Sequence, residues 1–233
     1  PTSNFTIDNI DCFTDNTTIT YNGNASSSAN YNWNFNGGNA TPGSGQGPHN
    51  INWQTTGNYT VSLSVEENGC YSDTTTVAVF NPPELTINSV VTDIDCYGLS
   101  NGEADITVAG GTQPYSFEWS NQTYNEDLFG VGAGPYTVTV TDANNCTETE
   151  SLSIDMPSEL SSSIANNISI CENTNTVLNA AATGGTPPYS YYWSTNQNTQ
   201  SINVSPTQNT TYYLTITDAN DCSMTRQVDV YIH

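Results

Sequence analysis

The stretch that decides the fold begins at Cys96 and ends at Cys146. Its two most informative parts are Gly110-Gly-Thr-Gln-Pro-Tyr115 and Gly134-Pro-Tyr-Thr-Val-Thr-Val-Thr-Asp142-Ala-Asn-Asn-Cys146. In residues 136–141 apolar and hydroxyl side chains alternate, which is the period of a β-strand with one buried face. A Gly/Pro turn followed by such a strand is typical of antiparallel β-sheet proteins.

The same plan occurs three times. Each copy has a cysteine, a tryptophan 21–23 residues later, an alternating strand that opens at a tyrosine, and a second cysteine 10 or 11 residues after that tyrosine. A period of about 75 residues is too long for a solenoid unit and suits a small domain. The sequence therefore predicts three domains, at residues 1–82, 83–157 and 158–233.

The predicted fold class is all-β, with three tandem Ig-like antiparallel β-sandwich domains. No segment keeps the 3.6-residue apolar period of a helix for three turns, whereas short alternating segments recur. The tyrosine that opens each penultimate strand fits a tyrosine corner. Links as short as Asn81-Pro-Pro-Glu84 restrict tumbling, so we expect a semi-rigid rod.

Strands are expected throughout each repeat. They fall near residues 4–8, 17–22, 30–35, 48–53, 58–65 and 73–80 in the first, with a loop at 37–48; near 85–92, 103–109, 115–119, 135–142 and 147–154 in the second; and near 160–165, 176–182, 189–193, 200–204, 211–217 and 224–232 in the third.

The six cysteines are expected to act as staples, because a domain of this size has a small core. Their separations within the three repeats are matched at 58, 50 and 51 residues, which predicts the bonds Cys12–Cys70, Cys96–Cys146 and Cys171–Cys222. Free buried thiols are the alternative. Zinc fits less well, because no two cysteines lie close in sequence. Disulfides in turn predict an oxidising compartment.

The charge balance excludes whole classes of function. The chain has 1 Lys+Arg against 23 Asp+Glu, a formal net charge of −22. Such a chain cannot bind nucleic acid electrostatically and is repelled by anionic membranes. No apolar run is long enough for membrane insertion. The first and last residues, Pro1 and His233, suggest an interior piece of something longer, so neighbouring domains of that chain are expected partners.

Motifs in all three repeats carry family resemblances. The second repeat resembles the SprB repeat of very large surface adhesins of gliding Bacteroidetes, through Cys96-Tyr-Gly, Gly110-Gly-Thr-Gln-Pro-Tyr115 and Gly134-Pro-Tyr-Thr-Val. The first repeat resembles a PKD domain, through Tyr31-Asn-Trp-Asn-Phe35 and Gly57-Asn-Tyr-Thr-Val61, with Asn36 departing from that family's acidic turn. The third repeat resembles PKD-like modules, through Gly184-Gly-Thr-Pro-Pro-Tyr189.

The resemblance implies a structural or adhesive segment of an extracellular, cell-surface fibre that gives reach and mechanical stability. It also implies export by the type IX system and contact with surface glycans, cell-surface targets or identical chains of a filament. An enzyme is not predicted, because His49 is expected in a loop, His233 is terminal and lysine is absent. The further alternative is a passive spacer beside a secreted enzyme.

A calcium- or carbohydrate-binding module is the main alternative function. No cofactor is predicted outright, but Asp93, Asp95, Glu103 and Asp105 gather near the start of the second repeat, and calcium prefers such oxygen ligands. The other interpretation is a solvated acidic surface. Asp142 and Asp218 fit turn residues that accept backbone N–H bonds.

Surface aromatics and one hydroxyl complete the candidates. Tyr124, Phe129, Tyr191 and Tyr213 could contact sugar, whereas the tryptophans of the repeat plan are assigned to the core. Asp73-Thr74-Thr75 resembles the O-glycosylation motif of exported Bacteroidetes proteins, which makes Thr74 a glycosylation candidate.

Overall fold

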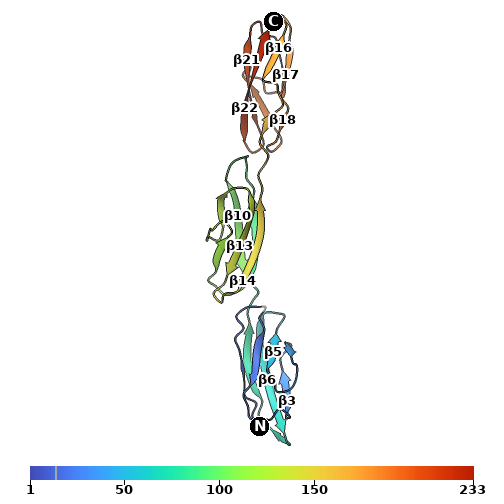
Figure 1. Ribbon diagram of the computed structural model, residues 1–233, viewed down its shortest axis with the longest axis vertical. Helices are drawn as coiled ribbons and strands as arrows, with labels where there is room; N and C mark the ends of the chain where they lie inside the picture. The colour runs from blue at the N-terminus through green and yellow to red at the C-terminus, as the bar shows by residue number, and fades with distance from the viewer. Residues whose placement is uncertain (14) are drawn as a thin grey trace. The chain divides into compact units, whose positions relative to one another are not determined.

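The computed structural model describes residues 1–13 and 15–233, and within them every regular element is a β-strand (Figure 1). The first two sheets hold strands β1 to β8. Their orders are β1 (Phe5–Ile7), β2 (Thr17–Tyr21), β5 (His49–Asn52), β4 (Asn39–Thr41), and β3 (Asn30–Asn34), β6 (Gly57–Glu67), β7 (Cys70–Tyr71), with β8 (Thr75–Asn81) also paired to β6.

The next two sheets hold β9 to β14. Their orders are β12 (Leu128–Val131), β10 (Gly102–Ala109), β9 (Thr86–Thr92), and β11 (Ser116–Trp119), β13 (Gly134–Thr141), β14 (Thr147–Ile154).

The last four-stranded sheet and two strand pairs hold β15 to β22. The orders are β16 (Asn167–Ile170), β22 (Ser223–Ile232), β21 (Thr210–Thr217), β19 (Ser190–Trp193); then β15 (Ser161–Ser162) with β18 (Ala182–Thr183); and β17 (Thr176–Asn179) with β20 (Ser201–Val204).

The described residues form two compact units. Unit 1 comprises residues 1–89, 106–126 and 137–151, and unit 2 comprises residues 90–105, 127–136 and 152–233. The boundary passes through the second sequence repeat. The division into three domains therefore stays a prediction, while the all-β class with antiparallel sheets is confirmed.

The alternation read from the sequence places the core of each unit. In β6 the buried residues Val61, Leu63 and Val65 alternate with half-buried Ser62 and Ser64. In β21 Tyr212, Leu214 and Ile216 are buried in the same way. Each such aliphatic side chain contributes roughly 1.5–3 kcal/mol when it leaves water. The hydroxyl side chains on the opposite face of these strands remain at least partly exposed to solvent.

The tryptophans of the repeat plan differ in depth. Trp119 and Trp193 are 1% and 0% exposed, as expected for core residues. Trp33 is only half-buried; it stacks on Phe35, and its indole N–H donates to Gly45 O at 2.8 Å. Trp53, which the repeat plan does not mark, is 3% exposed and joins the same core.

The predicted strands are present with shifted ends, except that the single strand expected at 176–182 is two strands, β17 and β18, which belong to different strand pairs. Four further strands were missed. These are β4, inside the predicted loop 37–48, the two-residue β7, β12 and β16. Strand β16 pairs with β22 in parallel, Ile170 opposite Ile232, which departs from a purely antiparallel sheet. Strands β4, β7 and β12 show no sustained apolar–polar alternation, and β16 alternates for only two periods, so the local sequence signal for all four is weak.

Two of the predicted tyrosine corners are confirmed by their hydrogen bonds. The hydroxyl of Tyr59 donates to Thr55 O at 2.8 Å, and that of Tyr136 donates to Gly132 O at 2.9 Å. Each bond ties the start of a strand to the loop before it. Tyr212, the third of the set, is buried at 8% exposure.

Candidate functional site

Two disulfides connect successive sequence repeats. Cys12 is bonded to Cys146, and Cys96 is bonded to Cys222, with Cα–Cα distances of 5.5 and 5.7 Å. Both distances are in the usual disulfide range. The predicted bonds Cys12–Cys70, Cys96–Cys146 and Cys171–Cys222 are therefore wrong, and Cys70 and Cys171 are free and exposed.

Strand geometry explains why the third repeat cannot close its own bond. Cys171 follows Ile170, which pairs with Ile232 near the end of β22, whereas Cys222 directly precedes the start of β22. The ten residues of β22 separate them by about 33 Å at 3.3 Å per residue. A disulfide requires Cα atoms within about 7 Å.

The first repeat has the same arrangement. Residues 7–11, just before Cys12, line a hollow together with residues 77–80 at the end of β8. Cys70 lies in the hairpin before β8 begins, where it pairs with Glu67. The seven residues of β8 span about 23 Å, so Cys12 and Cys70 sit at opposite ends of one strand.

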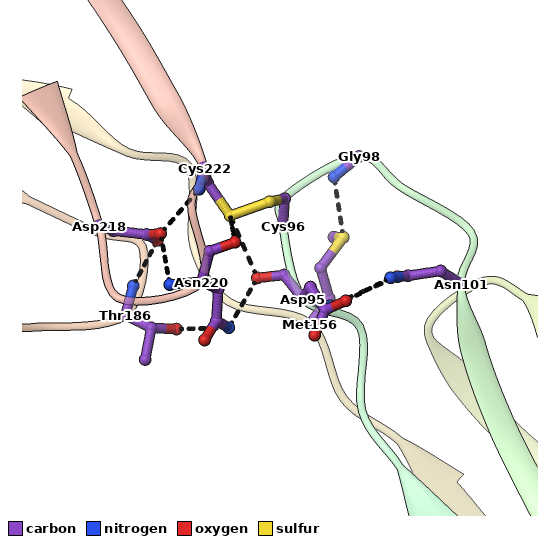
Figure 2. Close-up of a disulfide and its surroundings, with 9 residues drawn as sticks. All are labelled: Asp95, Cys96, Gly98, Asn101, Met156, Thr186, Asp218, Asn220 and Cys222. Atoms are coloured by element: carbon purple, nitrogen blue, oxygen red, sulfur yellow. Dashed lines mark hydrogen bonds between the residues drawn. A yellow bond between two sulfur atoms is a disulfide. The ribbon is translucent and has the colours of Figure 1, made fainter. Parts of the chain in front are cut away.

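The Cys96–Cys222 bond lies within a small hydrogen-bonded junction (Figure 2). The side-chain amide of Asn220 donates to Asp95 O at 3.0 Å and to Thr186 Oγ1 at 3.3 Å. The bridging sulfur of Cys222, which carries no proton, lies 3.3 Å from the same Asp95 oxygen. The carbonyl oxygen of Asp95 thus accepts a hydrogen bond from the Asn220 amide and lies in contact with the Cys222 sulfur.

The Cys12–Cys146 bond has the same surroundings. The amide of Asn144 donates to Asp11 O and to Thr112 Oγ1, both at 3.2 Å, and Cys146 Sγ lies 3.2 Å from Asp11 O. The sequence signals for these contacts are Asp-Cys before the first cysteine and Asp-Ala-Asn-x-Cys at the second. Sequence reasoning assigned Asp142 and Asp218 in this motif but missed the two asparagines.

The aspartates of both motifs organise the turns, as predicted. Asp218 accepts backbone N–H bonds from Asn220 and Cys222 at 2.9 Å, and from Thr186 at 2.8 Å. Burial alone raises the pKa of the Asp218 carboxyl, but these three donors outweigh it and leave the pKa below its usual value. Asp142 accepts the equivalent bonds from Asn144, Cys146 and Thr112.

A Gly-Gly turn brings Thr112 and Thr186 to these carboxylates. Gly110 and Gly184 have φ of +75° and +73°, and a Cβ there would lie 1.7 Å from Glu84 O and 2.0 Å from Glu159 O. Only glycine fits both the left-handed backbone and the close approach. The hydroxyls of Tyr115 and Tyr189 donate to the carbonyls of the same glycines, at 2.6 and 2.7 Å.

The four acidic residues considered as calcium ligands do not form a recognised metal-binding cluster in the described residues. Within residues 1–13 and 15–233 no group of three or more His, Cys, Asp or Glu side chains could hold a metal ion. Asp93 Oδ1 instead accepts the N–H of Asp155 at 2.8 Å, and Asp95 Oδ2 accepts from Asn101 Nδ2 at 2.6 Å. Glu103 and Asp105 are exposed on one face of β10.

The remaining candidates are placed as follows. Thr74 is exposed in the segment between β7 and β8, so its glycosylation stays a prediction. Tyr124, Phe129 and Tyr213 are 66%, 64% and 52% exposed, whereas Tyr191 packs against the core of unit 2. Within the described part of the chain there is no helix with the length and apolar character that a bilayer crossing needs.

The position of His49 differs from the expected loop position. The sequence suggested a loop position for His49 as well as a strand near 48–53; His49 opens β5, is fully buried, and packs edge-on against the stacked rings of Trp33 and Phe35. Its ring nitrogens contact Pro42 O and, at 3.2 Å, Gly45 O. The ring therefore anchors the 42–48 loop to the core.

A family model matches two stretches of the chain. The SprB repeat matches residues 88–123 and 170–198. The first stretch contains Cys96 and Trp119, and confirms the resemblance of the second repeat. The other contains Cys171 and Trp193, so the third repeat, which suggested a PKD-like module, matches SprB as well. No curated protein matches the chain.

Several solved structures are similar over long stretches. They include the three N-terminal domains of the bacteriophage RB49 highly immunogenic outer capsid protein (12% identity, 99% of this chain, 100% of that chain, TM-score 0.47), the N-terminal eight Ig domains of Down Syndrome Cell Adhesion Molecule (10%, 88%, 33%, 0.49) and the C-terminal fragment of intimin in complex with the intimin-binding domain of its translocated receptor (14%, 70%, 67%, 0.44). At these values they carry no argument about function.

Proposed function

We propose that this chain is a structural, adhesive segment of a large extracellular surface fibre, built to pass tension from one repeat to the next. The observation that carries the proposal is the pairing Cys12–Cys146 and Cys96–Cys222. A disulfide inside a repeat would stabilise that repeat alone. A disulfide to the following repeat adds a second covalent connection beside the linker.

The chemistry of the junctions supports an extracellular setting. Disulfides persist in oxidising compartments. The SprB-repeat matches favour a surface adhesin, and we extend this to export by the type IX system in a gliding bacterium. The net charge of −22 keeps such segments soluble and apart. We further propose that the three repeats are separate Ig-like modules of a semi-rigid rod.

The buried carboxylates and the buried imidazole have structural partners. The carboxylates of Asp142 and Asp218 are committed to backbone N–H groups, and His49 is enclosed in the core. An adhesive and load-bearing role needs no reactive group. It needs stable β-sheets, short links and covalent continuity, and the junctions supply the last of these.

The test is cell attachment under flow. In cells that display the native protein, Cys12→Ser and Cys146→Ser together remove one junction and leave no unpaired thiol from that bond. We expect unchanged attachment at rest and earlier detachment as shear stress rises. Antibody labelling of intact cells controls for equal display. Equal detachment curves at equal display would overturn the load-bearing proposal.

A further inference from the structure

The six cysteines belong to two classes, defined by their local turns. First-position cysteines are Cys12, Cys96 and Cys171, and the carbonyl of each accepts the N–H of the residue three positions later, at 3.0, 3.2 and 3.2 Å. Second-position cysteines are Cys70, Cys146 and Cys222. Each has an acidic residue four positions earlier, an asparagine two positions earlier and a positive-φ residue directly before it.

Both disulfides obey one rule. Each joins the first-position cysteine of a repeat to the second-position cysteine of the repeat that follows. Applied to this chain, the rule leaves one cysteine of each class without a partner. These two are Cys171 and Cys70, which are the free, exposed cysteines of the structure.

We propose that Cys171 and Cys70 are the two open halves of a third junction, and that each forms a disulfide with the complementary cysteine of another repeat of this kind. Cys171 takes a second-position cysteine of a following repeat, and Cys70 takes a first-position cysteine of a preceding one. The partner is thus a β-sandwich repeat with the opposite class of turn. A second copy of this chain carries both classes.

The surroundings of Cys171 match those of the bonded first-position cysteines. Its turn is closed by the N–H of Thr174 at 3.2 Å, as the turn of Cys96 is closed by that of Leu99. Ile170 O belongs to the residue directly before Cys171. In the two bonded turns the carbonyl at this sequence position, Asp11 O or Asp95 O, accepts the asparagine amide. Ile170 O already accepts the N–H of His233 at 3.1 Å, and a carbonyl has a second lone pair for the incoming amide.

Cys70 presents the complementary turn. Asn68 stands two positions before it, as Asn144 and Asn220 stand before Cys146 and Cys222. The carboxylate of Glu66 accepts the N–H of Gly69 at 2.8 Å, which is one backbone donor where Asp142 and Asp218 each accept three. Gly69, Asn145 and Asp221 have φ of 79°, 65° and 62°, so a left-handed residue precedes each of the three cysteines, and in the Cys70 hairpin Asn68 is left-handed as well, at 55°.

Bond formation requires a two-electron oxidant, and a low-molecular-weight disulfide such as oxidised glutathione supplies it. The Cys171 thiolate attacks one sulfur of the oxidant, forms a mixed disulfide and releases one glutathione thiolate. The Cys70 thiolate of the partner then attacks the Cys171 sulfur and releases the second. Two protein thiols are oxidised, one glutathione disulfide is reduced to two thiols, and the two protons of the protein thiols end, through solvent, on the released glutathione thiolates.

Two single variants test the pairing. Cys70→Ser keeps only the free Cys171, and Cys171→Ser keeps only the free Cys70. The two proteins carry different mass labels, are mixed in equal amounts in a glutathione redox buffer, and are separated without reductant. Random pairing of equally reactive thiols gives as much heterodimer as the two homodimers together. We expect a several-fold excess of heterodimer, with the Cys70–Cys171 linkage found by peptide mapping.

Three controls accompany the mixing experiment. Peptide mapping must show Cys12–Cys146 and Cys96–Cys222 intact in both variants, and Cys70→Ser with Cys171→Ser together must stay monomeric. Asn68→Leu, introduced into the Cys171→Ser protein, removes the amide and is expected to reduce the heterodimer excess. Statistical pairing, a homodimer majority, or glutathione-capped monomers alone would overturn the proposal.

Discussion

Pulling the oxidised chain by its termini should give a short, fixed contour length. Tension runs from Pro1 to Cys12, crosses to Cys146, returns along the chain to Cys96, crosses to Cys222 and leaves at His233. This path contains about 75 residues and reaches about 260 Å at 3.5 Å per residue, whereas the reduced chain reaches about 820 Å. Residues 13–95 and 147–221 lie off the path.

The oxidised wild type alone does not distinguish the pairing schemes, because three bonds within repeats would shorten the chain almost equally. The variant Cys70→Ser with Cys171→Ser does distinguish them. With the bonds of the structure its oxidised contour stays at about 260 Å, since neither residue is bridged. If bonds formed within repeats, only Cys96–Cys146 would remain and the contour would be about 640 Å.

Single-molecule force spectroscopy on this double variant, with and without reductant, provides the measurement. Handles at the two termini record total extension after the last unfolding event. An oxidised length near 640 Å, or no change on reduction, would refute both the pairing and the load path.

Four further predictions concern stability and ions. Gly184→Ala should destabilise unit 2 by about 3 kcal/mol in urea unfolding, because the added Cβ meets Glu159 O. The control Gly98→Ala, also at positive φ but with open space around it, should cost about 1 kcal/mol, and equal costs would contradict the steric argument. Because the folded-state pKa of Asp218 is lowered, its contribution to the free energy of unfolding is present above the unfolded pKa of about 3.9 and is lost as pH falls through the folded value. Asp218→Asn should therefore make the free energy of unfolding less dependent on pH in the acid range, and the exposed control Asp105→Asn should not. Tyr136→Phe removes the hydrogen bond to Gly132 O and should cost about 1 kcal/mol, against no measurable change for Tyr97→Phe at a 54% exposed site; a matching loss in both would argue against the tyrosine corner. Millimolar calcium should leave the thermal midpoint unchanged, and a rise that Asp93→Asn abolishes would support the calcium hypothesis instead.

The sequence predicts the strands well because alternation is a local property. β6, β13 and β21 begin and end close to their expected bounds, and their buried residues are the apolar ones of the pattern. The equally short β11 and β19 were predicted from the Gly-Gly/Pro turns that precede them, whereas no such turn precedes β12 or β16. β16 exists through its parallel pairing with β22, which is a non-local interaction.

The cysteine pairing was wrong for a different reason. In a periodic sequence the separation of matched positions is as regular between neighbouring repeats as within one: 134 and 126 residues for the observed bonds. Spacing therefore cannot distinguish the two schemes. Strand order does distinguish them. In the third repeat the first cysteine follows β16 and the second precedes β22, and these two strands run parallel, which places the two cysteines at opposite ends.

The same pairing makes the backbone redundant. A single hydrolysed peptide bond anywhere between Cys12 and Cys222 leaves every residue joined to both termini, because each such segment is bypassed by at least one sulfur bridge. Bonds confined within repeats would leave each linker as a point where one cut severs the molecule. For a protein exposed to secreted proteases, the two termini separate only after a cut in each of the segments 12–96, 96–146 and 146–222, although two cuts within one segment release the piece between them.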